Sequence, residues 1–125
     1  MMGDPVVFEY AVVRVVPRIE RGEFVNAGVI LYCQDRRFLE AGLDLDADRL
    51  RAIDADADVE AITSALESFV APCAGAGPAG ATSLGERFRW LAAPRSTIVQ
   101  TGPAHSGLTS DPAAELERLL DQLVR

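Results

Sequence analysis

The sequence contains no lysine, only one histidine and only two cysteines, and each shortage excludes a kind of site. His105, Cys33 and Cys73 are too few to build a structural zinc site from histidine and cysteine alone, and the two cysteines form no C-x-x-C motif. Twelve arginines are outnumbered by nineteen acids, which gives a net charge of −7. A nucleic-acid-binding protein needs a basic face that displaces counterions from phosphates, so nucleic-acid binding is not expected.

Long apolar runs and targeting signals are also missing. No stretch approaches the roughly 20 consecutive apolar residues of a transmembrane helix. The chain does not begin with a basic segment followed by an apolar one, so we expect neither secretion nor membrane insertion. The 125 residues, 49% of them hydrophobic, predict one folded domain over residues 1–125 in the cytoplasm. Cys33 and Cys73 are then expected to be free, buried thiols.

The negative charge is concentrated in one segment, residues 40–67. Before and after this segment, acids and arginines balance each other. Within it, Arg49 and Arg51 accompany nine acids. The nine acids are Glu40, Asp44, Asp46, Asp48, Asp54, Asp56, Asp58, Glu60 and Glu67. Such a segment is either a solvated helical face or an acidic patch that binds a basic protein partner.

Four segments have the pattern of β-strands. Residues 6–16 are rich in β-branched and aromatic residues and apolar on both faces, which predicts a central strand. Second and third strands are predicted at about residues 23–33 and 37–43, with the tight turn 34–36 between them. A short fourth strand is predicted at residues 97–100.

The rest of the chain is predicted to be mainly helical. The first helix begins after an N-cap at either Asp46 or Asp48. Three further helices begin after Asp58, Ser83 and Asp111, and Ser83 opens a capping box. The predicted fold class is therefore α+β, with an antiparallel meander of three strands plus a short fourth strand and about four helices packed on the sheet.

Two motif matches lack the structural context that their chemistry requires. Gly75, Gly77 and Gly80 match the dinucleotide fingerprint, but a helix and not a strand precedes them, so we interpret the segment as a loop. The alternating aspartates of residues 54–58 begin like a calcium-binding loop, yet Val59 stands where that loop requires glycine. These aspartates are better explained as helix N-caps and as first-turn acids that complement the helix dipole, and neither a cofactor nor a metal ion is expected.

His105 is the only side chain that could act as an imidazole base. Ser106 and Asp111 lie near it in sequence, but such closeness disfavours the geometry of a catalytic triad, and Gly107 suggests a turn. We therefore expect His105 in a loop, hydrogen-bonded to the backbone, with a catalytic role as the alternative.

An arginine and an asparagine lie within the two most apolar predicted strands. Arg14 needs a carboxylate or a bound anion, because an unpaired buried charge is very costly. One hypothesis is a structural pair between Arg14 and Glu23, with Asn26 fixing the loop backbone. The other is a polar binding pocket at the mouth of the hairpin, surrounded by Arg14, Arg18 and Arg21.

Three blocks of the sequence resemble a known protein family. They are Tyr10-Ala-Val-Val-Arg-Val-Val-Pro17 with Arg21-Gly-Glu-Phe-Val-Asn-Ala-Gly-Val29, then Phe88-Arg-Trp-Leu-Ala-Ala-Pro-Arg-Ser-Thr97, and His105-Ser-Gly-Leu-Thr-Ser-Asp-Pro112. Through these blocks the chain resembles, over nearly its whole length, the bacterial family called domain of unknown function 3037. The acidic middle and the glycine-rich loop are its departures from the family pattern.

The resemblance implies a protein partner, because members of the family tend to be encoded beside a kinase-like protein that resembles the toxin kinases of toxin–antitoxin pairs. It also directs attention to the polar residues Arg14, Glu23, Asn26, Arg95 and His105. Beside Arg95, the hydroxyls of Ser96 and Thr97 could complete a phosphate-binding group. The alternative is a loop that satisfies its own backbone.

Two functions are compatible with these features. The first hypothesis is a non-catalytic binding or regulatory module that pairs with another protein, with the kinase-like, toxin-type neighbour as candidate partner. The alternative is a small enzyme or ligand-binding protein for an anionic or phosphorylated substrate, bound by Arg14, Arg95 and His105 with Glu23 as base. This alternative requires the four side chains to converge on one cavity.

Overall fold

The computed structural model describes residues 3–75, 83–95 and 97–125 of the chain. Its strands form one antiparallel sheet in the order β3-β2-β1-β4, and β5 also pairs with β1. The strands are β1 (Val6–Val15), β2 (Val25–Cys33), β3 (Phe38–Leu43), β4 (Val99–Thr101) and β5 (His105–Thr109). The helices are α1 (Ala47–Ile53), α2 (Val59–Val70), α3 (Leu84–Leu91) and α4 (Pro112–Leu123), with the short 3-10 helices η1 (Ile19–Arg21) and η2 (Ala71–Ala74). The predicted α+β fold class is confirmed.

β1 is the central strand, as its two apolar faces predict. Along one edge it pairs with β2 over most of its length. Along the other edge it pairs with β5 near its start and with β4 near its end, so these two short strands together occupy the place of one interrupted strand. The meander of β1, β2 and β3 and the short fourth strand are confirmed, although β4 begins at Val99, two residues later than predicted.

The sequence does not predict the fifth strand, and the prediction that His105 lies in a loop is wrong. β5 starts at His105 and pairs with the first half of β1. Gly107 lies so close to Phe8 that a Cβ atom at this glycine would be 2.9 Å from the ring. Gly107 therefore allows close packing against the neighbouring strand and does not mark a turn.

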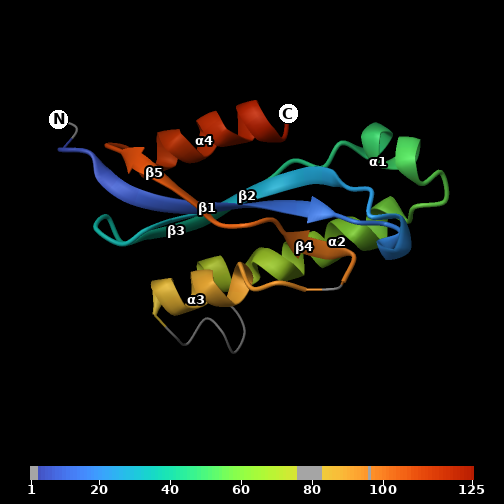
Figure 1. Cartoon of the computed structure of the whole chain (residues 1–125), viewed down its shortest axis with the longest axis horizontal. Helices are drawn as coiled ribbons and strands as arrows, with labels where there is room; N and C mark the ends of the chain where they lie inside the picture. The colour runs from blue at the N-terminus through green and yellow to red at the C-terminus, as the bar shows by residue number, and fades with distance from the viewer. Residues whose placement is uncertain (1–2, 76–82, 96) are drawn as a thin grey trace.

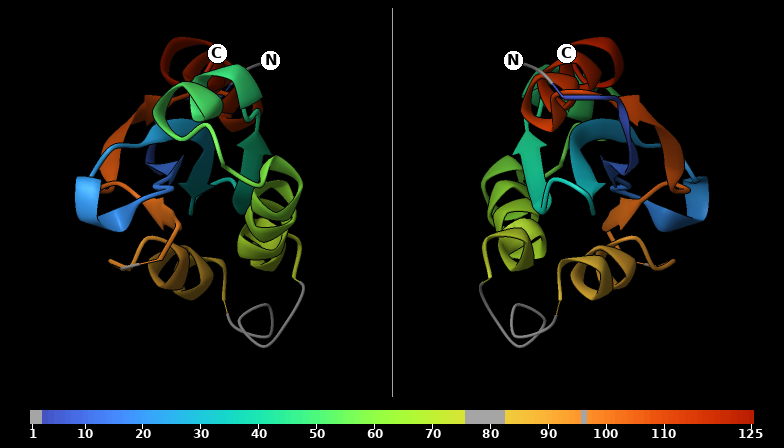
Figure 2. Two further views of the ribbon diagram at one scale, coloured as in Figure 1. Left: turned by 90° about the vertical axis from the view of Figure 1, so that its right-hand side faces the viewer. Right: turned by 90° about the vertical axis from the view of Figure 1, so that its left-hand side faces the viewer.

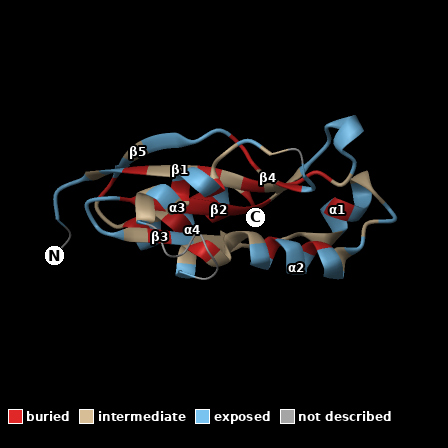
Figure 3. Ribbon diagram, turned by 90° about the horizontal axis from the view of Figure 1, so that it is seen from below, coloured by how far each residue is buried: buried red, intermediate tan, exposed pale blue. Residues whose placement is uncertain are grey.

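Helices cover both faces of the sheet, so the described residues form three layers, as Figure 1 and Figure 2 show. α4 lies across one face, and α2 and α3 lie on the other. The core beneath α4 contains Phe8, Val29, Leu31, Cys33, Leu116, Leu119, Leu120 and Val124. The core on the other face includes Val13, Val15, Ile30, Leu50, Leu66, Phe88 and Leu91. Figure 3 shows that the buried residues follow the strands and the inner sides of the helices.

The helix N-termini are capped as the sequence predicts. The Asp46 carboxylate accepts hydrogen bonds from two N–H groups in the first turn of α1, so Asp46 and not Asp48 is the cap. Asp58, Ser83 and Asp111 accept a backbone hydrogen bond in the same way at the starts of α2, α3 and α4. Among the described residues, no helix has the length and apolar character that crossing a membrane requires.

A β-bulge lies in the hairpin formed by β1 and β2. The register shifts just before Arg14, which lies opposite Asn26, so Ala27 is the extra residue. A glycine inside a strand indicates a bulge or a close backbone approach, and Gly28 beside the bulge shows the close approach directly. A Cβ atom at Gly28 would lie 2.4 Å from the carbonyl oxygen of Gly42. The bulge sets Arg14 and Asn26 side by side on the face that α4 covers.

Candidate functional site

The predicted pair between Arg14 and Glu23 is wrong. Glu23 lies before the first residue of β2, in an exposed loop where Nε of Arg21 donates to its carboxylate at 2.5 Å. This hydrogen bond lowers the pKa of the Glu23 carboxyl and raises the pKa of the Arg21 guanidinium. Arg21 is a near neighbour in sequence, so forming this pair closes only a very short loop.

Arg14 stacks on an aromatic ring instead. Its guanidinium carbon lies 4.4 Å from the centroid of Phe24, while its Nε is buried without a hydrogen-bond partner. A cation–π contact stabilises by about 0.5–2 kcal/mol. A buried polar group without a partner costs about 1–3 kcal/mol, and more when it is charged. The stacking on Phe24 therefore satisfies Arg14 only in part.

Asn26 connects the hairpin to the C-terminal helix and does not fix the loop backbone as predicted. Its Nδ2 donates to the carbonyl oxygen of Leu123 at 3.0 Å. Leu123 is the last residue of α4, and the final carbonyl groups of a helix lack partners within the helix. Asn26 thus fixes the place where α4 ends over the sheet.

The predicted cluster of three arginines at the mouth of the hairpin does not form. Nη2 of Arg18 lies 3.9 Å from the carboxylate of Asp54, in the connection between α1 and α2. Arg21 binds Glu23, and Arg14 stacks on its own aromatic partner. Because each guanidinium has a different partner, the three do not line a common pocket.

Arg95 lies on the other side of the sheet, between two aromatic rings. Its guanidinium carbon is 4.7 Å from the ring centroid of Phe69 and 4.5 Å from that of Trp90, whose carbonyl oxygen accepts from Nη2 at 2.5 Å. Burial lowers the pKa of Arg95. Ser96, its predicted neighbour in a phosphate site, lies outside the described residues. The Thr97 hydroxyl donates to a backbone carbonyl in β4, as expected for a loop that satisfies its own backbone.

His105 is exposed on β5 and packs on Tyr10, with 5.4 Å between the ring centroids. Tyr10 packs against the core beneath α4, so His105 and Arg95 lie against opposite faces of the sheet. Glu23 lies in the loop between β1 and β2. These side chains do not converge on one cavity, and the geometry does not support an enzyme that uses them together.

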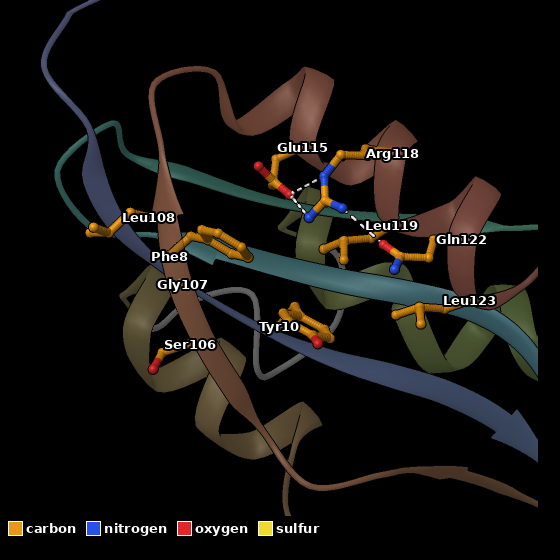
Figure 4. Close-up of a pocket in the computed structure, with 10 residues that line it drawn as sticks. All are labelled: Phe8, Tyr10, Ser106, Gly107, Leu108, Glu115, Arg118, Leu119, Gln122 and Leu123. Carbon is orange, nitrogen blue, oxygen red and sulfur yellow. Dashed lines mark hydrogen bonds and ion pairs between the residues drawn. The ribbon is translucent and has the colours of Figure 1, made fainter.

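A groove lies between α4 and the first part of β1, with β5 at its rim (Figure 4). We call it the α4 groove, and its volume is about 400 Å³. Its lining residues are Phe8, Tyr10, Ser106, Gly107, Leu108, Glu115, Arg118, Leu119, Gln122 and Leu123. The Arg118 guanidinium donates to the side chains of Glu115 and Gln122, so it already has hydrogen-bond partners within the groove. The lining combines β1, near the start of the chain, with β5 and α4, near its end, which is why the sequence does not predict it.

A larger groove follows α2 on the other side of the sheet. Two adjoining hollows, of about 740 and 260 Å³, share Ala65 and Ile98, and we call them together the α2 groove. Its apolar part includes Ile19 and Phe69, and Arg95 lies at its edge. Ile19 and Ile98 are 47% and 43% exposed, so aliphatic surface is open to solvent here.

One end of the α2 groove is acidic. Asp54, Asp56 and Asp58 line this end, and all three belong to the acidic segment 40–67. Asp58 caps α2 and Asp54 approaches Arg18. Asp56 is exposed and forms no ion pair within the part of the chain that the structure describes. The groove therefore combines apolar surface with negative charge that is not neutralised.

Where the structure describes them, the glycine motif and the alternating aspartates do not have the structural context of a dinucleotide or calcium site. Gly75 ends η2 with a φ of 83°, whereas Gly77 and Gly80 lie outside the described residues. A helical turn thus precedes the glycine motif, where a dinucleotide site needs a strand. Asp58 accepts from the N–H of Ala61 and caps α2, as predicted. Asp54 instead ends α1 and accepts from the N–H of Asp56 in the turn that follows, so it is not a helix N-cap. Over residues 3–75, 83–95 and 97–125, no three His, Cys, Asp or Glu side chains are grouped as metal ligands would be.

Cys73 is expected to react slowly with thiol reagents near neutral pH. Both cysteines are free, and burial raises the pKa of the Cys73 thiol to about 11. Because the thiolate is the nucleophile, only about one Cys73 in a thousand is reactive at about pH 8, and the rate should rise roughly tenfold for each pH unit up to about 11. Iodoacetamide labelling followed by mass spectrometry measures this rate. A rate that levels off near about pH 8.5, the ordinary range of a thiol, would contradict the assignment.

The fold and these surfaces define a small α+β protein in which helices cover both faces of an antiparallel sheet and surface grooves lie beside α2 and α4. The family model described as protein of unknown function (DUF3037) matches residues 10–124. The chain therefore belongs to this family, and the resemblance seen in its sequence blocks is confirmed. No curated protein and no solved structure matches the chain.

Proposed function

We propose that this protein is a non-catalytic binding module that pairs with another protein through the α2 groove. The observation that carries the proposal is that exposed aliphatic side chains and an acidic turn meet in one groove. Single exposed apolar residues are common on protein surfaces and need no explanation. A contiguous apolar hollow with charge at its rim is typical of an interaction site.

The chemistry of the groove favours a basic, amphipathic segment of the partner protein. Apolar side chains of the segment would pack beside Ile98, and a cationic side chain would lie over Asp56. Along the groove, α2 presents the small side chains of Ala61, Ala65 and Ser68, whose spacing of four and three residues places them on one helix face. Small side chains on this face let the partner's backbone approach α2 closely.

The position of the charge also explains why the acidic segment is useful in a binding module. Glu60 is exposed at the start of α2 and forms no ion pair within the described residues, so it adds to the negative field around the groove. Complementary charge speeds the encounter of two proteins and disfavours acidic competitors. Binding through such a surface is expected to weaken as salt is added.

A photo-crosslinking experiment tests whether the groove is the contact surface. A benzophenone amino acid replaces Ala65 in the groove and, as the matched control, Thr63 at about 200° around the same helix. Both positions are exposed. In cells that naturally produce the protein, we expect one partner to be crosslinked from Ala65 and not from Thr63. Equal crosslinking from the two positions, or none from either, would contradict the proposal.

Charge reversal at the acidic end is expected to weaken binding of the partner found in this way. Asp56→Arg places a cation where the partner's cation should lie, and the affinity should fall about tenfold or more. Glu67→Arg makes the same change in charge on the side of α2 away from the groove, and the affinity should change less than about threefold. Isothermal titration calorimetry measures both variants. Equal losses would show that net charge, and not the groove, determines binding.

The kinase-like neighbour that the family resemblance implies is the first candidate partner for this titration. A non-catalytic role agrees with the separate positions of Arg95, His105 and Glu23. A cytoplasmic setting is part of the proposal, since both Cys33 and Cys73 are free thiols and the cytoplasm keeps thiols reduced. If the kinase-like protein does not bind while another crosslinked protein does, the binding function holds and only the partner changes.

A further inference from the structure

A row of three polar side chains crosses the sheet at Arg14. Arg14 on β1 lies opposite Asn26 on β2 and opposite Gln100 on β4. Residues directly opposite each other in an antiparallel sheet point to the same face, which here is the face that α4 covers. Val99 and Thr101, on either side of Gln100, are buried toward the other face. The row, which we call the Arg14 row, therefore places one guanidinium between two side-chain amides.

Each member of the Arg14 row has hydrogen-bonding capacity left over. Nδ2 of Asn26 donates to a carbonyl at the end of α4 at 3.0 Å, and Nε2 of Gln100 donates to the carbonyl of Thr97 at 2.7 Å. A side-chain amide nitrogen carries two N–H donors, so each amide keeps a second one. Nε of Arg14 is buried without a partner, and no ion pair reaches this guanidinium within the described residues.

A purely structural role does not explain Arg14. The acid expected to neutralise it, Glu23, is bound by Arg21 in the loop. The guanidinium carbon lies over the Phe24 ring, but this contact provides no hydrogen-bond acceptor for the buried Nε. An apolar side chain could fill the same place without leaving a charge unpaired.

A glycine backbone lies beside the guanidinium of Arg14. The Gly102 N–H donates to the carbonyl of Val12 at 2.9 Å, which holds this glycine beside the guanidinium. A Cβ atom at Gly102 would lie 3.2 Å from Nη2 of Arg14, tighter than an ordinary contact. A side chain at this position would therefore press on the Nη2 end of the fork. Arg14, Asn26 and Gln100 are each only partly buried, so solvent reaches the row.

We propose that the Arg14 row is a binding site for a small oxyanion, a carboxylate or phosphate group held by the guanidinium and flanked by the amides of Asn26 and Gln100. Arginine binds such groups through two parallel, charge-assisted hydrogen bonds. A bound oxyanion would supply the partner that the sheet does not provide for Arg14. The site faces the α4 side of the sheet and the α2 groove lies on the other side, so this proposal stands independently of the protein-binding function.

The Nε–Hε resonance of Arg14 tests the site directly in the intact, unmodified chain. Heteronuclear NMR follows this resonance during separate titrations with inorganic phosphate and with acetate. We expect a saturable shift with at least one probe, and the probe that saturates identifies the class of oxyanion. If neither phosphate nor acetate shifts this resonance saturably, the proposal is wrong.

Three variants test whether oxyanion binding depends on the geometry of the Arg14 row or only on its positive charge. Gln100→Ala removes one flanking donor and should weaken binding about fivefold. In the unmodified chain the Asn26 side-chain amide should also shift saturably; Arg14→Lys keeps the charge but removes the fork, so this shift should be lost. Arg51→Gln, at an exposed position on α1, is the control and should leave binding unchanged. If the unmodified chain and the three variants bind equally, the proposal is wrong. If Arg14→Lys does not fold, the comparison of Gln100→Ala with the control Arg51→Gln decides the question.

Discussion

Replacing Phe88 with alanine is expected to lower the free energy of unfolding by about 4 kcal/mol. Phe88 is completely buried in the core beneath α2 and α3, and its ring stacks on Tyr32 with 5.5 Å between the centroids. Truncation leaves a cavity between α3 and the sheet and removes this stack. The expected loss is large beside the roughly 5–15 kcal/mol by which a whole domain is usually stable.

Trp90 supplies the matched control for this prediction, because it lies on the same helix and is larger. Its side chain is 50% exposed, and its main partner is the guanidinium of Arg95. Trp90→Ala should therefore cost about 1 kcal/mol or less. Chemical denaturation followed by circular dichroism measures both variants. Equal losses would mean that Phe88 is not the central side chain of this core.

The parts of the fold that the sequence predicts are those that local chemistry determines. The run of β-branched residues makes β1 central, and Asp58 and Asp111 each bind backbone N–H groups only three residues away. Such interactions need no knowledge of the rest of the fold. They explain why the helix starts and the three-stranded meander are predicted from the sequence with small errors at the ends.

β5 shows where local reasoning is insufficient. His105 and the four residues that follow include a glycine and a serine, which are weak strand formers, and they are extended because β1 has a free edge there. Gly107 permits this pairing because the Phe8 ring occupies the space where a Cβ atom would be. That cause lies in a strand about a hundred residues earlier, so the sequence near His105 contains no sign of it.

The candidate sites, like the fold, are predicted from the sequence only where local chemistry determines them. Arg14 is recognisable from sequence because a charge inside an apolar strand needs a partner, but its neighbours are not. The sequence places Glu23 near the start of the return strand, where it could lie opposite Arg14, yet Arg21 is close to Glu23 along the chain and binds it. Gln100 joins the Arg14 row only through the pairing of β4 with β1, which no local pattern predicts. The two grooves are likewise assembled from segments far apart in sequence.

Gly28→Ala is expected to lower the free energy of unfolding by about 3 kcal/mol, at the upper end of the usual cost of overpacking. The added Cβ atom would lie 2.4 Å from the carbonyl oxygen of Gly42 and 2.7 Å from a methyl group of Leu43. The first of these atoms is backbone of the neighbouring strand, so a side-chain rotation cannot relieve the contact. β2 and β3 must then separate locally, in a sheet that is packed on both faces.

Thermal or chemical denaturation measures this loss, and Gly3→Ala is its control. At Gly3 the nearest atom to an added Cβ, at 2.9 Å, is the end of the exposed Arg36 side chain, which donates to the carbonyls of Asp4 and Ser110. A movement of this side chain relieves the contact at the cost of a surface hydrogen bond, so stability should change by less than about 1 kcal/mol. Because Gly28 directly follows the bulge residue Ala27, its replacement should also shift the side-chain amide resonance of Asn26, even where the protein stays folded. A stable Gly28→Ala variant with an unchanged Asn26 resonance would mean that β2 and β3 do not approach each other so closely at this bulge.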